Sequence, residues 1–349
     1  MDDRIERVCR AITPPHRASA RLSQVRQLTL ARPAGSLGVL DETVHRIAAI
    51  RGAVPSGVPP VMISVLAGDH GVAERGTSAF RAGLTAPVLE LILAGQAPVN
   101  LLADRVPARV CAADVGLRTP VGDDRFRVGA GTADICDADA MPLAGARAAM
   151  EAGVSYTEEH LGDAELVAVG EIGVGNTTAT SVLAARMLGL DPADVVGRGS
   201  GVDDATLLRK RDLVAMALAR NAVAADDPVE LLAAFGGYEI AANVGVILAA
   251  ASARRVVLLD GFITGVAALL AARLCPAVTG YLVAGHQSAE PGHGAVLDAL
   301  GLRPLLTLDM RLGMASGAAL ALGLLTSALA VATGTPPARA VGLAGAGTA

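Results

Sequence analysis

The sequence predicts an α/β fold in which a mainly parallel sheet is covered by helices on both faces. Three observations carry this prediction. Apolar runs of strand length recur along the chain and end in Gly and polar residues, and helical patterns separate most of them. Strand–loop–helix repetition of this kind builds parallel sheets. The 40 glycines are also too many for a plain helical bundle and indicate loops where backbone meets ligand.

Taken in order, the elements begin with helices over residues 1–55, where LDETVHRIAAI has an amphipathic pattern. Six strand-like runs follow, and helices such as those over 178–190 and 238–255 separate most of them. The runs cover residues 61–71, 108–116, 164–178, 254–262, 280–294 and 304–313. The polar, Gly-rich segment 122–142 is predicted to be a long loop, and the tail after Gly334 is expected to be loose at its end.

Composition and charge argue against several classes of protein. The net charge of −5 and the lack of a long basic run speak against a nucleic-acid binder. The cysteines are far apart and form no CxxC pair, which suggests reduced thiols in a cytoplasmic protein; they are Cys9, Cys111, Cys136 and Cys275. Residues 314–332 carry no charge and are long enough to span a bilayer, but their Ala, Gly, Ser and Thr content favours a buried helix of a soluble protein.

Two Gly-rich loops are candidate phosphate sites. In GEIGVGNTTATS, Gly173 and Gly175 allow close approach of the backbone, and a predicted helix starts at Asn176, Thr177 and Thr178. The purely structural interpretation of this loop is a tight turn with a well-made helix cap. The second loop, GRGSGVDDATLLRK, supplies Gly199, Ser200, Gly201 and Lys210, while Asp203 and Asp204 are expected to cap the next helix.

Two further clusters of polar residues follow strands. Asp69 and His70 could form an acid–base pair, although a structural hydrogen-bonding role is the simpler interpretation. No third and fourth ligand stands at matching spacing, so no metal is expected. The loop GHQSAEPGHG is similarly compact and holds His286, Ser288, Glu290 and His293.

Eight stretches, in the same order and spanning about Arg32 to Leu325, resemble the nicotinate-nucleotide:dimethylbenzimidazole phosphoribosyltransferase family. They are RPAGSLG, AGDHGVAERGTSAF, GEIGVGNTTATS, GRGSGVDDATLLRK, GGYEIAANVG, LLDGFITGVAAL, HQSAEPGH and LRPLLTLDMRLG followed by SGAALAL. The resemblance implies a large Rossmann-like domain, a small helical domain from the chain ends, and a homodimer. The expected division is 1–55 for the first part of the small domain, 56–330 for the large domain and 331–349 for a tail, with part of the C-terminal helical region joining the small domain.

The resemblance also implies a reaction and a set of site residues. Ribose 5-phosphate passes from nicotinate mononucleotide to a benzimidazole nitrogen, giving an α-linked ribotide and nicotinate, and no cofactor takes part. The phosphate and nucleotide are expected at Gly173, Gly175, Asn176, Thr177, Thr178, Gly199, Ser200, Gly201, Lys210 and Ser288. The acceptor pocket is expected at Ser78, Phe80, Pro87 and Leu312.

The acceptor side departs from the family pattern. Where the family reads RLGEGSGA this chain reads RLGMASGA, so Met314 stands at the position of the general base. Pro87 stands where the family has Gln, and Arg81–Thr85 differ from the usual Pro-Pro-Glu-Val-Thr. Glu171 survives and is a candidate replacement base or a stabiliser of positive charge on the ribose. Asp309 is a weaker candidate base.

Three hypotheses stay open at this stage. The chain is a phosphoribosyltransferase with an altered acceptor, an ordinary dimethylbenzimidazole enzyme that tolerates Met314, or a catalytically impaired paralogue that binds a nucleotide or benzimidazole as a sensor or partner. In each case the expected ligands are small molecules, with no nucleic acid and no membrane. Nicotinate release separates the first two hypotheses from the third.

Overall fold

The computed structural model describes residues 3–223 and 227–342 and centres on a five-stranded parallel sheet. Its strands are β1 (Val61–Gly68), β2 (Ala108–Gly116), β3 (Leu166–Ile172), β4 (Val256–Leu259) and β5 (Leu282–Ala284), in the order β2-β1-β3-β4-β5. Every neighbouring pair is parallel. All residues of β1, β3, β4 and β5 are buried, which explains why these strands read as unbroken apolar runs. The predicted fold class is confirmed.

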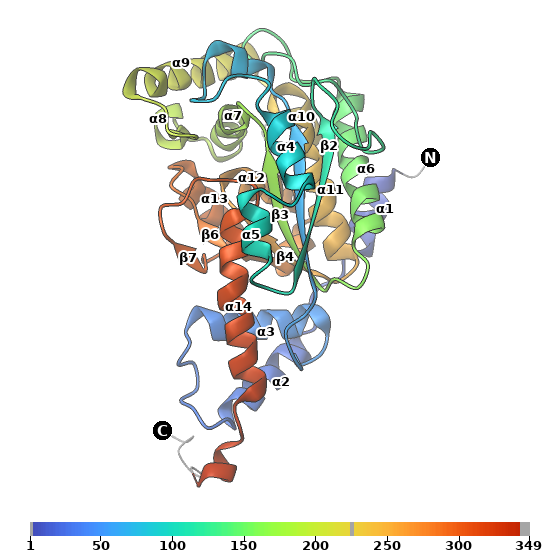
Figure 1. Cartoon of the computed structure of the whole chain (residues 1–349), viewed down its shortest axis with the longest axis vertical. Coiled ribbons are helices and arrows are strands. Elements are labelled where there is room, and N and C mark those ends of the chain that lie inside the picture. The colour runs from blue at the N-terminus through green and yellow to red at the C-terminus, as the bar shows by residue number, and fades with distance from the viewer. Residues whose placement is uncertain (1–2, 224–226, 343–349) are drawn as a thin grey trace.

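Helices cover both faces of the sheet (Figure 1). One face packs against α6 (Leu143–His160), α11 (Tyr238–Ser252) and α12 (Phe262–Leu274). The other face packs against α4 (Thr85–Leu93), α5 (Pro98–Ala103) and the first part of α14 (Ser316–Gly334). Helices α6 and α11 approach closely because each has a glycine at the contact: a Cβ on Gly153 would overlap the Ala242 carbonyl oxygen, and one on Gly245 the Met150 carbonyl oxygen.

The remaining helices of the sheet-containing part pack outside these layers. They are α7 (Asn176–Leu188), α8 (Pro192–Val195), α9 (Asp204–Arg220), α10 (Pro228–Phe235) and α13 (Gly292–Leu300), with short 3₁₀ turns at Gly71–Arg75 and Pro276–Tyr281. A third 3₁₀ turn, Ala338–Val341, follows α14 at the far end of the molecule from these helices. Helix α9 begins at the predicted cap, because the Asp203 carboxylate accepts a hydrogen bond from the Thr206 amide.

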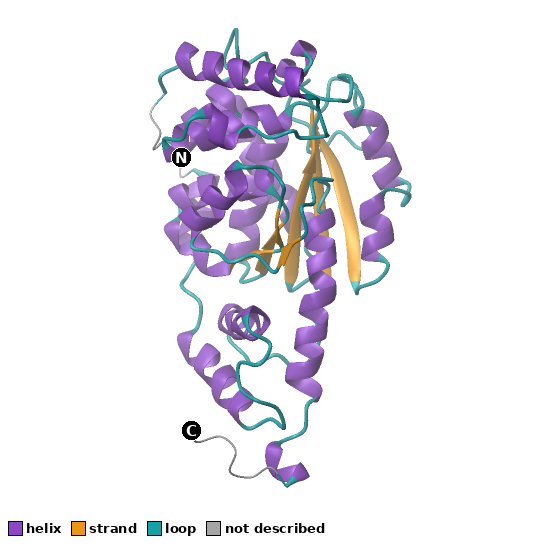
Figure 2. Ribbon diagram, turned by 90° about the vertical axis from the view of Figure 1, so that its left-hand side faces the viewer, coloured by secondary structure: helices purple, strands orange, loops and turns teal. Residues whose placement is uncertain are grey.

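Below the sheet, two helices from the first part of the chain pack with the last helix (Figures 1 and 2). Helices α2 (Arg17–Leu28) and α3 (Val39–Arg51) pack on each other, and α3 packs on α14. An antiparallel bridge joins Leu30 to Pro337. In contrast, α1 (Arg4–Ala11) packs on α6 and α11, beside the sheet. The domain boundaries at residues 55 and 330 stay predictions, and α1 contacts the large domain although it lies before residue 55.

The last predicted strand run does not join the main sheet. Only β7 (Leu306–Thr307) forms, and it pairs with β6 (His286–Gln287) in a separate two-stranded sheet. Pro304 lacks an amide hydrogen and Asp309 has a left-handed φ of 52°, so the backbone between them has little room for a ladder. The predicted loop over 122–142 contains no helix or strand. The last residues of the expected tail, 343–349, lie outside the described residues.

Two stretches of the described chain are apolar and long enough to cross a membrane by length and composition, 85–103 and 316–334. The first is divided here between α4 and α5. In the second, half of the residues are buried against the rest of the protein. Buried core helices of soluble proteins share this composition, so the finding carries little weight, and the absence of a membrane partner stays a prediction.

Candidate functional site

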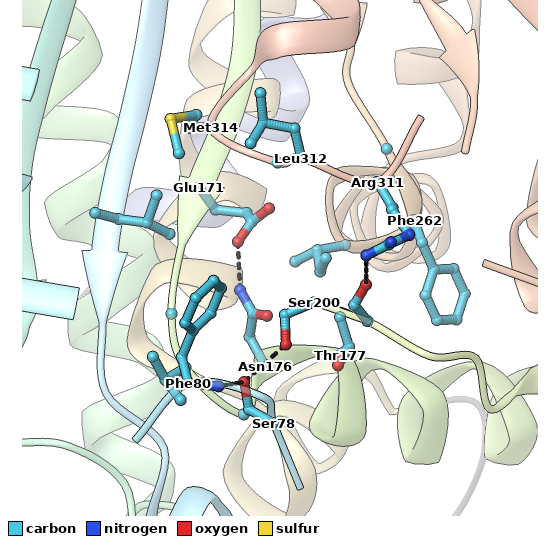
Figure 3. A pocket seen from close by; sticks show the side chains of 18 of the residues that line it. Ser78, Phe80, Glu171, Asn176, Thr177, Ser200, Phe262, Arg311, Leu312 and Met314 are labelled. Atoms are coloured by element: carbon cyan, nitrogen blue, oxygen red, sulfur yellow. Dashed lines mark hydrogen bonds between the residues drawn. The ribbon is translucent and has the colours of Figure 1, made fainter. Parts of the chain in front are cut away.

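The strand order locates a crevice before any side chain is considered. The chain passes from β1 to β2 on one side and returns to β3 on the other side of β1. In open α/β sheets, ligands bind at the carboxyl ends of the strands beside such a reversal. A cavity of about 290 Å³ lies here, lined by loops after β1, β3, β4 and β6, by the start of α4 and by the turn before α14 (Figure 3).

Most of the predicted site residues line this one cavity. They are Ser78, Phe80, Glu171, Gly173, Gly175, Asn176, Thr177, Gly199, Ser200, Ser288, Leu312 and Met314. Four others do not line it, namely Thr178, Gly201, Lys210 and Pro87. Pro87 lies on the exposed side of α4, and its neighbours Leu84 and Val88 face the cavity instead. The roles assigned to all these residues stay predictions.

The first Gly-rich loop leads directly into the amino end of α7. Gly175 has a φ of 94° and precedes Asn176, the first residue of the helix. A Cβ on Gly173 would lie 2.6 Å from the carbonyl oxygen of Gly68, so only glycine lets the ends of β1 and β3 approach this closely. The free amides of a helix start at the cavity wall suit an anion such as phosphate.

Lys210 connects the two Gly-rich loops from behind. It is fully buried, and its Nζ donates to the Gly197 carbonyl oxygen (2.9 Å) and to Thr177 Oγ1 (3.2 Å). Glu290 holds the same loop, because its Oε1 accepts a hydrogen bond from the Gly199 amide (2.8 Å). Burial lowers the pKa of Lys210, and the charge of Glu290 opposes that shift. Lys210 therefore supports the cavity wall without itself forming part of it.

Arg311 is a lining residue that the sequence interpretation did not single out. Its guanidinium lies against Gly201, which has no side chain to block it, and Nη1 donates to the Gly199 carbonyl oxygen (3.2 Å). Among the described lining residues it is the one Arg or Lys. Arg311 directly precedes the predicted site residues Leu312 and Met314 in the sequence, and this position could have identified it as a site residue. Ser78 and Ser200 also line the cavity, with their hydroxyl oxygens 3.0 Å apart.

Glu171 is the most strongly perturbed carboxyl in the cavity. Its side chain is buried, and Asn176 Nδ2 donates to its Oε2 (Figure 3). Burial, followed by the negative charges of Glu239 and Asp260, raises the pKa of Glu171 from 4.5 to about 8. A carboxyl with a pKa near neutrality is suited to exchange a proton with a bound ligand.

Met314 lies beside Glu171 on a strained turn. Gly313, Met314 and Ala315 have φ values of 78°, 48° and 61°, three left-handed residues in succession. Such conformations cost a non-glycine residue on the order of 1–3 kcal/mol and concentrate at functional sites. The Met314 amide donates to the Glu171 carbonyl oxygen (3.1 Å), which fixes the turn to the end of β3. The thioether of Met314 cannot take up a proton, whereas Glu171 can.

The two His clusters form separate buried pairs. His70 does not pair with Asp69; its Nε2 lies 2.7 Å from Glu239 Oε1. Asp69 instead accepts from the Arg118 amide. His286 Nε2 lies 3.5 Å from Asp260 Oδ1, and His293 Nδ1 accepts from the Ser288 amide. No group of three His, Cys, Asp or Glu suited to a metal ion occurs among the described residues.

Known proteins resemble this chain over nearly its whole length. A family model described as phosphoribosyltransferase matches residues 12–340. The nicotinate-nucleotide–dimethylbenzimidazole phosphoribosyltransferase of Desulforudis audaxviator is 40% identical over 334 residues, covering 94% of this chain and 95% of the relative. That of Chloroflexus aggregans is 42% identical over 325 residues, covering 92% of each. The crystal structure of CobT from Thermus thermophilus superposes with a TM-score of 0.89 at 37% identity, covering 94% of this chain and 99% of that one.

Proposed function

We propose a function from the premise that the chain belongs to the phosphoribosyltransferase family. It transfers ribose 5-phosphate from nicotinate mononucleotide to 5,6-dimethylbenzimidazole, producing nicotinate and an α-linked ribotide. One observation carries the proposal beyond the family. Residues from both loops predicted to hold the phosphate and three of the four residues predicted to hold the acceptor line the same cavity, together with Glu171.

The donor fits the end of the cavity that is rich in backbone amides. Its phosphate needs hydrogen-bond donors and positive charge. The start of α7 supplies amides, Thr177 supplies a hydroxyl, and Arg311 supplies a guanidinium. Lys210 places a cation directly behind Thr177. We assign the phosphate to this end.

The acceptor fits the apolar end. Phe80, Leu84, Val88, Leu312 and Met314 contribute aromatic, branched and thioether surface there. A flat, methylated bicyclic ring buries well against such side chains, and sulfur contacts with aromatic rings are favourable by about 0.3–1.5 kcal/mol. Met314 is then part of the acceptor wall.

The bond changes follow from this arrangement. The bond from C1 of the ribose to the pyridinium nitrogen breaks, and nicotinate leaves readily because departure neutralises its ring charge. One benzimidazole nitrogen bonds to C1 from the opposite face, which gives the α linkage. The proton on the other ring nitrogen must then leave. Glu171 lines the cavity, its backbone contacts that of Met314, and its carboxyl can take this proton, so we assign it the role of base.

We also propose that the protein is a homodimer. Helix α14 has no charged residue along its length, and Leu320, Leu324 and Val331 are exposed on one of its sides. Exposed apolar stripes of this kind mark contact surfaces, and a second copy of the chain can cover an identical stripe. The cytoplasmic location and the absence of nucleic-acid partners remain expectations from the sequence.

The test is chromatography of nicotinate after incubation with nicotinate mononucleotide, with and without 5,6-dimethylbenzimidazole. The proposed function predicts nicotinate release that depends on the acceptor, with one ribotide formed for each nicotinate released. Release of no nicotinate in the presence of the acceptor would contradict the proposal.

A further inference from the structure

Three of the buried carboxylates near the carboxyl ends of β1, β3 and β4 differ in what holds them. Glu171 ends β3 and has an amide partner, Asn176. Asp260 follows β4, and its Oδ1 accepts from the Ala318 amide in the first turn of α14 (2.9 Å) and lies 3.5 Å from His286 Nε2. Glu239 lies in the first turn of α11 and contacts His70. Asp260 and Glu239 therefore each have a histidine beside them, whereas Glu171 has a neutral amide at the start of α7.

Glu239 is enclosed more tightly than the others. Its side chain and that of His70 are both fully buried. A Cβ on Gly68 or on Gly237 would lie 2.5 Å from Glu239 Oε2, and a Cβ on Gly173 would lie 3.3 Å from its Oε1. Three glycines from β1, from the loop after β3 and from the residue before α11 thus make room for one carboxylate. Its Oε2 has no hydrogen-bond partner among the described residues.

This enclosure connects Glu239 to the cavity. Gly173 is the first residue after β3 and lines the cavity. The position of its absent Cβ is 3.3 Å from Glu239 Oε1 and also 3.3 Å from Asn176 Nδ2, the atom that donates to Glu171. Glu239 therefore lies directly behind the loop on which Glu171 and Asn176 meet. It does not line the cavity and cannot touch a substrate there.

The surroundings favour negative charge on Glu239 over Glu171. The amino end of a helix stabilises an anion by about 0.3–1 kcal/mol, and more when partly buried, and a histidine N–H adds a strong hydrogen bond. Glu171 has no histidine partner; its donor is the neutral side-chain amide of Asn176, and it faces the two other carboxylates. When carboxyl groups share a site and their environments differ, the less stabilised one carries the exchangeable proton.

We propose that Glu239 is a positioning residue for the reaction, whose fixed charge behind Gly173 makes Glu171 the carboxyl that exchanges the acceptor's proton. The inference rests on the proposed function and deepens it. Glu239 acts through Glu171 and not on the substrate. The charged or titratable groups that face Glu171 are Glu239 from α11 and Asp260 from the end of β4, and His70 and His286 face those two carboxylates in turn.

We predict the direction in which the pH dependence of the rate shifts when Glu239 loses its charge. As a base Glu171 must be ionised, so the rate of ribotide formation should rise with pH through about 8. Glu239→Gln keeps the shape of the side chain and removes its charge, so the midpoint should fall by about 1 pH unit. His70→Gln retains a donor to Glu239 and leaves the charge in place, so its midpoint should stay near that of the unmodified protein. Glu90→Gln is the control: it removes one negative charge from the exposed side of α4, and it should leave the midpoint of the pH dependence unchanged.

The variants separate the effect of the charge of Glu239 from the effect of its packing. A lowered midpoint in Glu239→Gln alone supports the inference. An unchanged midpoint in a folded, active Glu239→Gln overturns it, as does an equal shift in His70→Gln. If Glu239→Gln does not fold, Glu239→Asp replaces it. The retained charge then predicts a retained midpoint, and a fall of a full unit contradicts the inference.

A second readout makes failure of the inference distinguishable from failure of the proposed function. The infrared C=O band of protonated Glu171, assigned by its loss in Glu171→Gln, can be titrated without any turnover. If the unmodified protein makes no ribotide, the proposed function fails. The effect of Glu239 on Glu171 is then still decided by whether that band titrates at lower pH in Glu239→Gln.

Discussion

At the scale of single residues, the reaction depends on which group accepts a proton beside Met314. Met314 has no group that takes up a proton, and the structure fixes its turn to Glu171 at the end of β3. A positioned base typically contributes about 10²–10⁴-fold to a rate. We assign that contribution to Glu171.

Met314→Glu should therefore add a second base and raise the rate of ribotide formation at pH 7 by about tenfold or more, because Glu171 is largely protonated there. Met314→Gln is the matched control, since it is polar but takes up no proton, and it should not raise the rate. Steady-state kinetics with 5,6-dimethylbenzimidazole measure both variants. Equal rates in Met314→Glu and Met314→Gln would show that proton removal at this turn does not limit the reaction.

The raised pKa of Glu171 also predicts a pH dependence of stability. A folded-state pKa of about 8, above the ordinary value of 4.5, means that the folded protein holds this proton more tightly than the unfolded chain. The resulting stability is fully present below pH 4.5 and is lost as pH rises toward 8, by at most roughly 1.4 kcal/mol per pH unit. Glu171→Gln should lack this loss. Denaturant unfolding at pH 5 and pH 8 measures it, and parallel changes in both proteins would contradict the assigned pKa.

At the scale of elements, the α6–α11 contact supports the sheet face behind the cavity. Gly153 has no space for a Cβ, whereas Gly145 in the same helix would place one at 3.6 Å from its nearest neighbour, an ordinary contact. Gly153→Ala should therefore cost about 1–3 kcal/mol of unfolding free energy, as overpacking does. Gly145→Ala should be neutral or up to about 1 kcal/mol more stable, because alanine favours helix. Urea unfolding compares the two variants, and similar stabilities would refute the close contact.

The elements also show what sequence reasoning can and cannot reach. The strands β1, β3 and β4, the start of α7 and the cap at Asp203 follow from local periodicity and turn chemistry, and the sequence predicted them. The short length of β7 could not be predicted in this way, because it depends on the backbone at Asp309 and on pairing with β6. The burial of Lys210 and the pairing of His70 with Glu239 join segments far apart in sequence, so no local pattern could reveal them.

At the scale of the whole molecule, α14 links the two parts of the chain and carries the exposed stripe of Leu320, Leu324 and Val331. The proposed dimer predicts twice the chain mass by light scattering. Leu324→Asp should yield the monomer mass, because a charge in an apolar contact is costly to bury. Leu208→Asp, on the exposed side of α9, is the control and should leave the mass unchanged. A monomer mass for the unmodified protein would contradict the dimer. If the unmodified protein then co-sedimented with lipid vesicles, the stripe would be a membrane-contacting surface instead.

The central claim is that Glu171 takes the proton that the acceptor loses when it bonds to the ribose. The most direct measurement is the rate of ribotide formation from nicotinate mononucleotide and 5,6-dimethylbenzimidazole in the unmodified protein and in Glu171→Gln, at saturating substrates and pH 8. We expect an active unmodified protein and a loss of about 10²-fold or more in Glu171→Gln, with nicotinate mononucleotide still bound. An active protein whose rate is unaffected by Glu171→Gln would contradict it.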